Sequence, residues 1–387
     1  MLAFAEEHNQ LGLAKIKVLG VGGAGGNAVN SMLAANQQDI EFIVANTDAQ
    51  ALLSSQALHK LQLGIKATKG LGTGANPELG RQAAEEDLEQ ILAAVAGADI
   101  VFLTAGMGGG TGSGATPVIA RALRAQGILT VAVVTKPFNF EGKRRARIAA
   151  ETIQRLKAEV DTLIILPNQK LLEHVGDDVT MVDAFALINN VLNQAVRSIS
   201  DIIVRPGHIN VDFADLRTIM HNMGVAVMGT GVASGPERAL TAALHAISSP
   251  ILENVDIRGA KSVLLNITGG ADLTLHEINV AASVIYEQAD PDANIIIGSV
   301  VDEQLAGEIA VSLIATGFDQ AVTATLMPAV DLTVPVNALA GVGYEPYPVS
   351  SADSLTAAVS CAPAESEQRD NLDVPAFLRR KNNISAT

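Results

Sequence analysis

The sequence predicts an α/β fold in which a Rossmann-like parallel sheet is joined by one long central helix to a smaller α+β domain. In the first 167 residues, five apolar, strand-like runs alternate with helical patterns. This alternation is typical of a parallel sheet with right-handed crossovers and helices on both faces. An uninterrupted helical pattern then covers residues 181–204, and shorter strands and helices continue to about residue 318, where they predict the second domain.

Composition and charge narrow the class of protein. The chain has 387 residues, 48% hydrophobic and 17% charged, which is enough to bury the cores of two domains. A formal net charge of −15 argues against nucleic acid as a partner, because nothing would neutralise a polyphosphate backbone. The single cysteine, Cys361, permits no internal disulfide and fits a reducing cytosol. No apolar run approaches the roughly 20 residues that span a bilayer, and residues 1–10 do not resemble a leader, so we expect neither export nor direct membrane insertion.

Three glycine-rich turns accompany the expected strands. The strands are expected at residues 15–20, 41–45, 99–104, 128–135 and 162–166. One turn, residues 20–27, directly follows the first strand, and the stretch 105–114 directly follows the third. The remaining turn, residues 70–75, leads into Asn76, the expected N-cap of a helix that runs to about residue 96 and ends at Gly97. Because parallel strands end at a common edge of the sheet, we expect the three turns to lie together.

The stretch 105–114 is the strongest candidate for a binding site. It carries six glycines in nine positions, before a helix expected at residues 115–125 and opened by Pro117. In such a turn, successive backbone N–H groups converge on an anion, and the following helix adds the positive end of its dipole. The hydroxyls of Thr111 and Ser113 could also reach phosphate oxygens, so phosphate is the expected ligand. The alternative is a flexible glycine turn that binds nothing.

A second interpretation of the first turn is a dinucleotide site. Residues 20–25 satisfy the pattern G-x-G-x-x-G after a strand, and Asp48 lies near the end of the second strand, where a ribose-binding acid is sought. The alternative function is therefore an NAD(P)-dependent oxidoreductase. Three glycine turns at one edge suit a triphosphate better than a single pyrophosphate. The Walker A pattern of P-loop proteins is absent from the sequence.

The whole set of motifs resembles the tubulin family, and most closely its bacterial cell-division GTPases. Residues 109–114, Gly-Gly-Thr-Gly-Ser-Gly, are similar to that family's signature loop, and the resemblance covers residues 15–318 and resumes in the tail. It implies a tubulin-like fold and GTP or GDP as ligand, accompanied by Mg²⁺. It also implies GTP hydrolysis coupled to assembly into the filaments of a division ring.

The same resemblance implies which residues contact the nucleotide. Around the phosphates it places the glycine turns and their neighbours: Gly22, Gly23, Ala24, Gly25, Gly26, Asn27, Asn46, Thr47, Asp48, Ala49, Gly72, Gly74, Asn76, Gly106, Gly108, Gly109, Gly110, Thr111, Gly112, Ser113 and Pro137. Glu141 and Arg145 would meet the ribose and neighbouring groups, while Phe185 and Asn189 would stack on and hydrogen-bond the guanine. Without the resemblance, Phe185 is equally well a core residue and Arg145 a solvated charge. Ala24 replaces a glycine of many relatives, which costs little unless φ is positive there.

Two carboxylates are the candidates for the hydrolytic step. Hydrolysis of a phosphoanhydride needs an oriented water and a divalent ion. Asp212 and Asp215 lie three residues apart at the start of an expected helix, so they share one face near its positive end. Acids in these positions also cap helices. The resemblance of Asn210-x-Asp212-x-x-Asp215 to the family's catalytic loop favours catalysis. The residues that would bind the divalent ion are left open.

Helix geometry separates these acids from the nucleotide of the same chain. From Asn189 to the end of the long helix near Val204 there are about 15 residues, or roughly 22 Å at 1.5 Å per residue. If Phe185 and Asn189 hold the base, Asp212 cannot reach the γ-phosphate bound by its own chain. We therefore expect the acids to act on the nucleotide of the next subunit, in a head-to-tail homopolymer that grows as a filament.

The predicted organisation has six parts. They are a flexible N-terminus (1–12), a GTP-binding domain (13–180), the central helix (181–205), a C-terminal α+β domain with the catalytic loop (206–318), a disordered acidic linker (319–371) and a tail (372–387). The tail segment from Asp373 to Lys381 combines an apolar core with a basic end, which favours a docking peptide over a solvated tail. By resemblance it would bind membrane tethers and division regulators. The chain is then expected in the cytoplasm, assembled at the division site beneath the inner membrane.

Overall fold

The structure of the protein is a computed structural model that describes residues 14–35, 40–174, 179–205, 209, 211–249, 251–252 and 257–318. All of these residues belong to one compact unit, Met1–Asp331. Several predictions lie outside the described residues. They concern the N-terminus 1–12, the candidate catalytic residue Asn210, the linker 319–371 with Cys361, and the tail 372–387.

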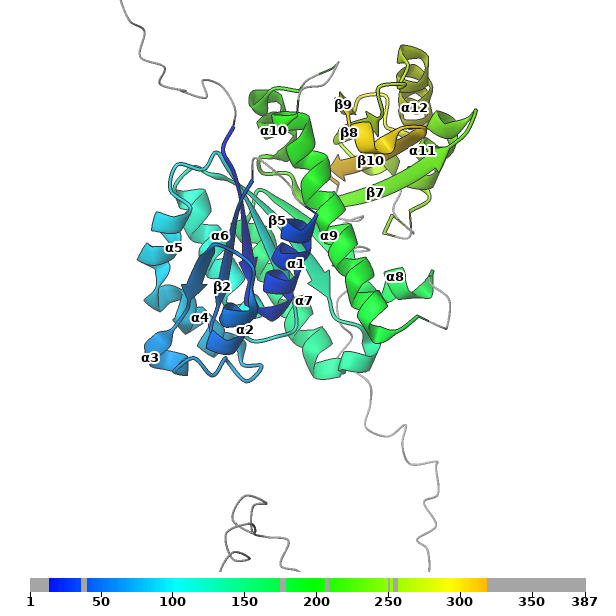
Figure 1. Ribbon diagram of the computed structural model, residues 1–387. Helices are drawn as coiled ribbons and strands as arrows, with labels where there is room; N and C mark the ends of the chain where they lie inside the picture. The colour runs from blue at the N-terminus through cyan, green and yellow to red at the C-terminus, as the bar shows by residue number, and fades with distance from the viewer. Residues whose placement is uncertain are drawn as a thin grey trace, which may run out of the picture. The chain divides into compact units, whose positions relative to one another are not determined.

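A parallel sheet forms the first half of the described chain (Figure 1). Its strands are β1 (Ile16–Val21), β2 (Ile40–Asn46), β3 (His59–Gln62), β4 (Ile100–Gly106), β5 (Leu129–Lys136) and β6 (Thr162–Pro167). They lie in the order β3-β2-β1-β4-β5-β6, and each neighbouring pair is parallel. The strand order reverses between β1 and β4. The crevice at their carboxyl ends is therefore the topological switch point, where open sheets of this kind bind ligands.

The sheet continues into the second half of the chain. Its further strands are β7 (Gly224–Ser234), β8 (Ser262–Gly269), β9 (Asn294–Val301) and β10 (Glu308–Thr316). β7 pairs in parallel with β6 over residues 224–226 only, and it then pairs antiparallel with β10. β10 is antiparallel to β8, which is parallel to β9. Within the described residues, the two predicted domains thus share one continuous ten-stranded sheet.

Helices cover both faces of the sheet (Figure 1). Their bounds are α1 (Gly22–Ala34), α2 (Ala49–Ser54), α3 (Ile65–Thr68), α4 (Pro77–Glu86), α5 (Leu88–Ala94), α6 (Thr111–Ala125), α7 (Lys143–Glu159), α8 (Asn168–Glu173), α9 (Met181–Val204), α10 (Phe213–Met220), α11 (Arg238–Ile247) and α12 (Leu275–Gln288), with short 3-10 turns η1 (Asn139–Glu141), η2 (Ile257–Gly259) and η3 (Glu303–Leu305). One core lies under α1 and α9, a second under α4 to α7, and a third under α11 and α12. No helix among the described residues combines the length and apolar character that crossing a membrane requires.

The long helix α9 has the bounds that its periodicity predicts. The hydroxyl oxygen of Thr180 caps its start by accepting a hydrogen bond from the backbone N–H of Asp183 at 3.2 Å. Ile188, Leu192 and Ile199 are buried on one face of the helix and belong to the core that it shares with α1. Farther along, α9 also contacts β8 and β9, so it connects the two halves of the molecule.

The structure corrects several predicted bounds. The helix predicted to run to residue 96 is broken at Asp87, because its buried carboxylate accepts a hydrogen bond from the backbone N–H of Gly64 at 2.6 Å. α6 begins at Thr111 rather than at residue 115, and Pro117 lies inside the helix instead of opening it. Strand β3 was missed, because His59–Gln62 is a short and mostly polar edge strand.

Candidate functional site

A cleft of about 460 Å³ lies where the carboxyl ends of β1 and β4 meet the starts of α1 and α6. It is lined by many of the predicted site residues: Gly22, Gly23, Ala24, Asn27, Gly106, Gly109, Gly110, Thr111, Gly112, Pro137, Glu141, Arg145, Phe185 and Asn189. Thr73, from the predicted glycine turn 70–75, also lines it. The other lining residues were not singled out from the sequence: Val21, Met107, Thr135, Asn168, Ile188 and Leu192. The volume and the mixture of apolar walls with a few polar groups are typical of a small-molecule site.

Bare backbone forms one end of this cleft. A Cβ atom at Gly23 or Gly109 would meet nothing within 4 Å, so a missing side chain leaves open space at both positions. The turns run directly into helices, since α1 begins at Gly22 and α6 at Thr111. Unpaired N–H groups and the positive ends of two helix dipoles therefore favour an anion here. Ala24 is not among the residues with positive φ, so it carries no backbone strain.

Other glycines allow the turns to pack against one another. A Cβ atom at Gly110 would overlap the hydroxyl oxygen of Thr73, and one at Gly114 would overlap the carbonyl oxygen of Pro77. At Gly25 it would overlap a backbone oxygen of β4. The high glycine content therefore serves contact between turns as well as access to the cleft, and only the second use was predicted.

Other predicted site residues do not line the cleft. They are Gly25, Gly26, Asn46, Thr47, Asp48, Ala49, Gly72, Gly74, Asn76, Gly108 and Ser113. The carboxylate of Asp48 caps α2 by accepting a hydrogen bond from the N–H of Gln50 at 2.9 Å. Asn76 caps α4 in the same way, as predicted. The hydroxyl oxygen of Ser113 accepts a hydrogen bond from the N–H of Gly108 at 2.9 Å, which fixes the turn before α6.

Aromatic rings lie at the other end of the cleft. Phe185, in the first turns of α9, keeps 41% of its surface exposed, so it is not a core residue. Its ring meets Phe138 edge to face with centroids 5.5 Å apart, and Phe138 stacks on Phe140 at 4.9 Å. Of these three rings only that of Phe185 lines the cleft, where it offers an apolar face to a planar ligand group.

Asn168 is a lining residue that the sequence interpretation missed. Its side chain is 5% exposed, and its Oδ1 is buried with no hydrogen-bond partner among the described residues. A buried amide oxygen without a partner is costly, unless a ligand supplies a donor. The available signal was position, because Asn168 directly follows β6 at the edge where the ligands of parallel sheets bind.

A charged pair lies between the two ends of the cleft. Arg145 Nη1 donates a hydrogen bond to Glu141 Oε2 at 2.6 Å, and both residues line the cleft. The other oxygen of Glu141 accepts a hydrogen bond from the backbone N–H of Phe138 at 2.9 Å. Glu141 therefore holds both the backbone of Phe138 and the guanidinium of Arg145 in place. Because Arg145 is half exposed, its remaining N–H groups are accessible to a polar ligand group.

The two candidate acids lie elsewhere. Asp212 and Asp215 are exposed at the start of α10, and neither lines the cleft. Asp212 Oδ1 accepts a hydrogen bond from the N–H of Asp215 at 2.8 Å, so Asp212 is the helix N-cap. Figure 1 shows α10 beside the end of α9 that lies away from α8. Phe185 and Asn189 are near the beginning of α9, so the length of that helix separates the cleft from the acids.

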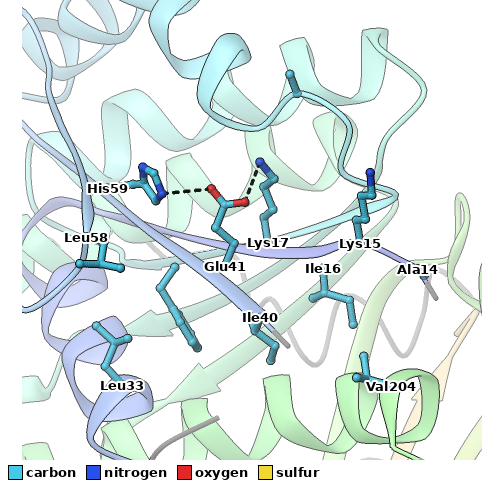
Figure 2. Close-up of a pocket in the computed structure, with 12 residues that line it drawn as sticks. Ala14, Lys15, Ile16, Lys17, Leu33, Ile40, Glu41, Leu58, His59 and Val204 are labelled. Carbon is cyan, nitrogen blue, oxygen red and sulfur yellow. Dashed lines mark ion pairs between the residues drawn. The ribbon is translucent and has the colours of Figure 1, made fainter. Parts of the chain in front are cut away.

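A larger cavity, of about 630 Å³, lies at the amino ends of β1 and β2 (Figure 2). Glu41 there pairs with Lys17 at 2.9 Å and with His59 at 3.5 Å. Apolar side chains such as Leu33 and Val204 form another part of its wall. Its lining contains no glycine turn and no predicted site residue, and its carboxylate is already paired, so the cleft at the carboxyl ends is the candidate site.

Two family models match the chain. The Tubulin/FtsZ family, GTPase domain, matches residues 15–176, and the FtsZ family, C-terminal domain, matches residues 224–319. A solved structure of an empty FtsZ dimer from M. jannaschii is 42% identical to the chain, with a TM-score of 0.76. The match covers 80% of this chain and 89% of that one. The chain belongs to the FtsZ family. The predicted resemblance to tubulin-like proteins is thereby confirmed, and so is the fold class.

Curated FtsZ relatives are longer than this chain. The cell division protein FtsZ of Magnetospirillum gryphiswaldense is 50% identical over 369 residues, which cover 93% of this chain and 66% of that protein. FtsZ of Caulobacter vibrioides is 53% identical over 314 residues, covering 81% of this chain and 62% of the relative. The matches therefore span just under two thirds of these relatives. Because the FtsZ match includes the first glycine turn, the oxidoreductase alternative has no support.

Proposed function

We propose that the chain binds GTP and GDP in the cleft and hydrolyses GTP when it assembles head to tail with further copies of itself. The observation that carries this proposal is the two-ended cleft, with bare backbone at two helix starts and an aromatic and amide surface opposite. The match of this region to the GTPase domain of the Tubulin/FtsZ family supports it.

Each end of the cleft suits one part of the nucleotide. The phosphates would lie against the backbone of Gly23 and Gly109, near the hydroxyl of Thr111, where N–H groups and helix dipoles stabilise negative charge. The guanine would stack on Phe185, with the amides of Asn168 and Asn189 hydrogen-bonding its edge. Glu141 and Arg145, between the two ends, would meet the ribose and neighbouring groups.

We propose that Mg²⁺ accompanies the triphosphate. No group of three or more histidine, cysteine or acidic side chains that could cage a metal occurs among the described residues. This fits Mg²⁺, which keeps several waters and is usually held by one or two protein oxygens and the substrate phosphates. The hydroxyl of Thr111, which lines the cleft, is the candidate protein ligand. The ion would neutralise charge on the phosphates.

The acids of α10 would complete the active site of the next subunit. Hydrolysis needs a group that orients the attacking water, and a carboxylate can serve as one. Among the described lining residues the one carboxylate is Glu141, which is already paired with Arg145. Asp212 and Asp215 are exposed and outside the cleft of their own chain. A head-to-tail contact would bring them to the γ-phosphate bound by a neighbour, with Asn210 in the same loop. Hydrolysis would then depend on assembly, and loss of the γ-phosphate would weaken the contact.

The proposed cellular role is cell division. The chain's curated relatives are named cell division protein FtsZ, which supports this role. The chain would form filaments of the division ring in the cytoplasm beneath the inner membrane. The tail segment 373–381 would dock on membrane tethers and division regulators. The acidic linker before it would set the reach of that contact.

A direct test measures phosphate release from GTP by the purified chain over a range of protein concentrations. The proposal predicts that the rate per molecule rises steeply once filaments form and falls toward zero on dilution. A rate per molecule that stays constant on dilution would remove assembly from the mechanism. NADH added to the same protein should give no fluorescence change, whereas a saturable change would revive the oxidoreductase alternative.

A further inference from the structure

A chain of hydroxyl groups lies beneath the phosphate end of the cleft. Thr47, directly after β2, is completely buried, and its Oγ1 is 2.6 Å from Oγ1 of Thr111, the first residue of α6. Oγ1 of Thr73, from the third glycine turn, is 3.4 Å from the same Thr111 oxygen. Thr111 and Thr73 line the cleft, whereas Thr47 does not. Thr47 therefore lies one residue behind the ligand surface.

The backbone of Thr47 is held from a second side. Its carbonyl oxygen accepts hydrogen bonds from the backbone N–H of Gly72 and from the hydroxyl of Thr68, both at 3.3 Å. The side chain of Thr47 thus contacts the turn before α6, while its backbone contacts the third glycine turn. This single residue connects two of the turns that form the cleft.

Hydrogen-bond accounting indicates the direction of the bond between Thr47 and Thr111. Each threonine hydroxyl has one proton to donate, and a buried proton without an acceptor is costly. Among the described residues, the hydroxyl of Thr47 has one hydrogen-bond partner, Oγ1 of Thr111. Thr47 is therefore the donor and Thr111 the acceptor. The proton of Thr111 must then point elsewhere, and its other neighbour, Thr73, is at the long distance of 3.4 Å.

We propose that Thr47 is a positioning residue that directs the hydroxyl proton of Thr111 toward the phosphate chain of the bound nucleotide. A hydroxyl that donates to a phosphate makes a charge-assisted hydrogen bond, which is stronger than a bond between neutral groups. Without Thr47, the Thr111 hydroxyl rotates freely between phosphate and protein acceptors. This inference rests on the proposed binding of GTP in the cleft and extends it to a residue that does not touch the ligand.

The test uses two substitutions of similar size. Thr47→Val keeps the shape of the side chain and removes the donor, whereas Thr47→Ser keeps the donor and removes one methyl group. Equilibrium binding of GTP and of guanosine is measured with the full chain, below the concentration at which it assembles. Thr47→Val should weaken GTP binding about tenfold and leave guanosine binding unchanged, and Thr47→Ser should bind GTP within about twofold of the wild type.

The double variant Thr47→Val with Thr111→Val shows whether the effect passes through Thr111. The proposal predicts that the double variant binds GTP no more weakly than Thr111→Val alone, because the relay is already lost there. Additive losses would overturn it, and so would GTP binding by Thr47→Val at wild-type strength. Equal weakening of GTP and guanosine would show a structural role and overturn it as well. Wild-type protein that bound no GTP would contradict the proposed function itself, which separates the two failures.

Discussion

Glycine residues around the cleft either allow two turns to pack closely or leave open space for a ligand, and the neighbouring residues Gly110 and Gly109 show one use each. At Gly110 the space for a side chain is already filled by Thr73 and by the backbone of Asn76. At Gly109 the same space is open. Gly110→Ala should therefore lower the free energy of unfolding by about 1 to 3 kcal/mol, as overpacking does. Gly109→Ala should change it by less than about 0.5 kcal/mol. Urea unfolding of the two variants is the measurement, and equal stabilities would refute this division.

Asn168 offers a residue-scale test of base recognition. Asn168 lines the cleft and its Oδ1 lacks a partner among the described residues, so we expect this oxygen to accept a hydrogen bond from a donor on the guanine edge when the nucleotide binds. Asn168→Leu keeps the size of the side chain and removes that acceptor. We expect the variant to lose at least about tenfold in affinity for GTP and to bind ITP, which lacks the 2-amino group, with a smaller loss. Similar losses for both nucleotides would show that Asn168 does not contact the amino group.

Residue types with an unusual local pattern could be predicted from the sequence, and residues with ordinary patterns could not. The glycine turns stand out because glycine is unfavourable unless the backbone requires it. Asn168 lies one residue beyond a strand and looks like an ordinary polar residue there, and the family resemblance includes Thr47 among the phosphate neighbours without indicating its bond to Thr111. Their significance comes from burial and from partners far apart in sequence, such as Thr111 for Thr47. Such contacts exist only in the folded chain.

At the scale of elements, α9 acts as a spacer between the cleft and α10. Its stripe of buried residues makes it rigid, because both halves of the molecule pack against it. The ion pairs of Arg197 and Arg205 with Asp302 add a connection from the end of α9 to the turn after β9. A rigid spacer keeps the acids at a fixed distance from the nucleotide of their own chain.

The connection between α11 and α12 predicts a dependence of stability on pH. The guanidinium of Arg238, which is itself buried, hydrogen-bonds the Glu277 carboxylate at 2.6 Å and holds the pKa of Glu277 at about 2, below its ordinary value. A carboxyl group with a lowered pKa in the folded state stabilises the fold above its unfolded pKa. That contribution is lost as the pH falls from about 4.5 toward 2. Glu277→Gln should therefore flatten the fall of the melting temperature over this range.

A matched control lies on the same helix. Glu287 is exposed near the end of α12 and makes no ion pair with any described residue. Glu287→Gln should leave the pH profile of the melting temperature close to that of the wild type. If both variants gave the same profile as the wild type, the pair of Arg238 and Glu277 would not contribute to stability.

Long periodic elements could be predicted from the sequence, and short or interrupted ones could not. The range of α9 follows from apolar residues at helical spacing. The short strand β3 has four mostly polar residues at the edge of the sheet and gives no such signal. The break between α4 and α5 depends on a hydrogen bond of Asp87 with distant Gly64, which local periodicity cannot reveal.

At the scale of the whole molecule, the candidate acids lie apart from the cleft, since neither Asp212 nor Asp215 lines it. Asp212 has two roles that substitutions can separate, since it caps α10 and carries a candidate catalytic carboxylate. Asp212→Asn keeps a good N-cap and removes the charge, while Asp212→Ala removes both. Both variants should bind GTP as the wild type does and lose turnover. Only Asp212→Ala should lose about 1 kcal/mol of stability. A large loss of GTP binding in Asp212→Asn would place the acid in the cleft of its own chain.

The separation between the acids and the cleft could be predicted from the sequence, because each residue of a helix adds a fixed rise along the helix axis. The continuous sheet through both halves could not be predicted. It depends on the length of β7 and on its change of partner from β6 to β10, and both are tertiary features.

The most direct test of the central claim mixes two inactive variants. Asp212→Asn has an intact cleft and lacks the acid, and Gly109→Asp has the acid and places a repelling carboxylate in the open space of the cleft. If acid and nucleotide meet between subunits, about a quarter of randomly formed contacts in an equal mixture are complete. We expect GTP turnover to appear in the mixture at up to about a quarter of the wild-type rate, although each variant alone is inactive. A mixture that coassembles and remains inactive would contradict the account.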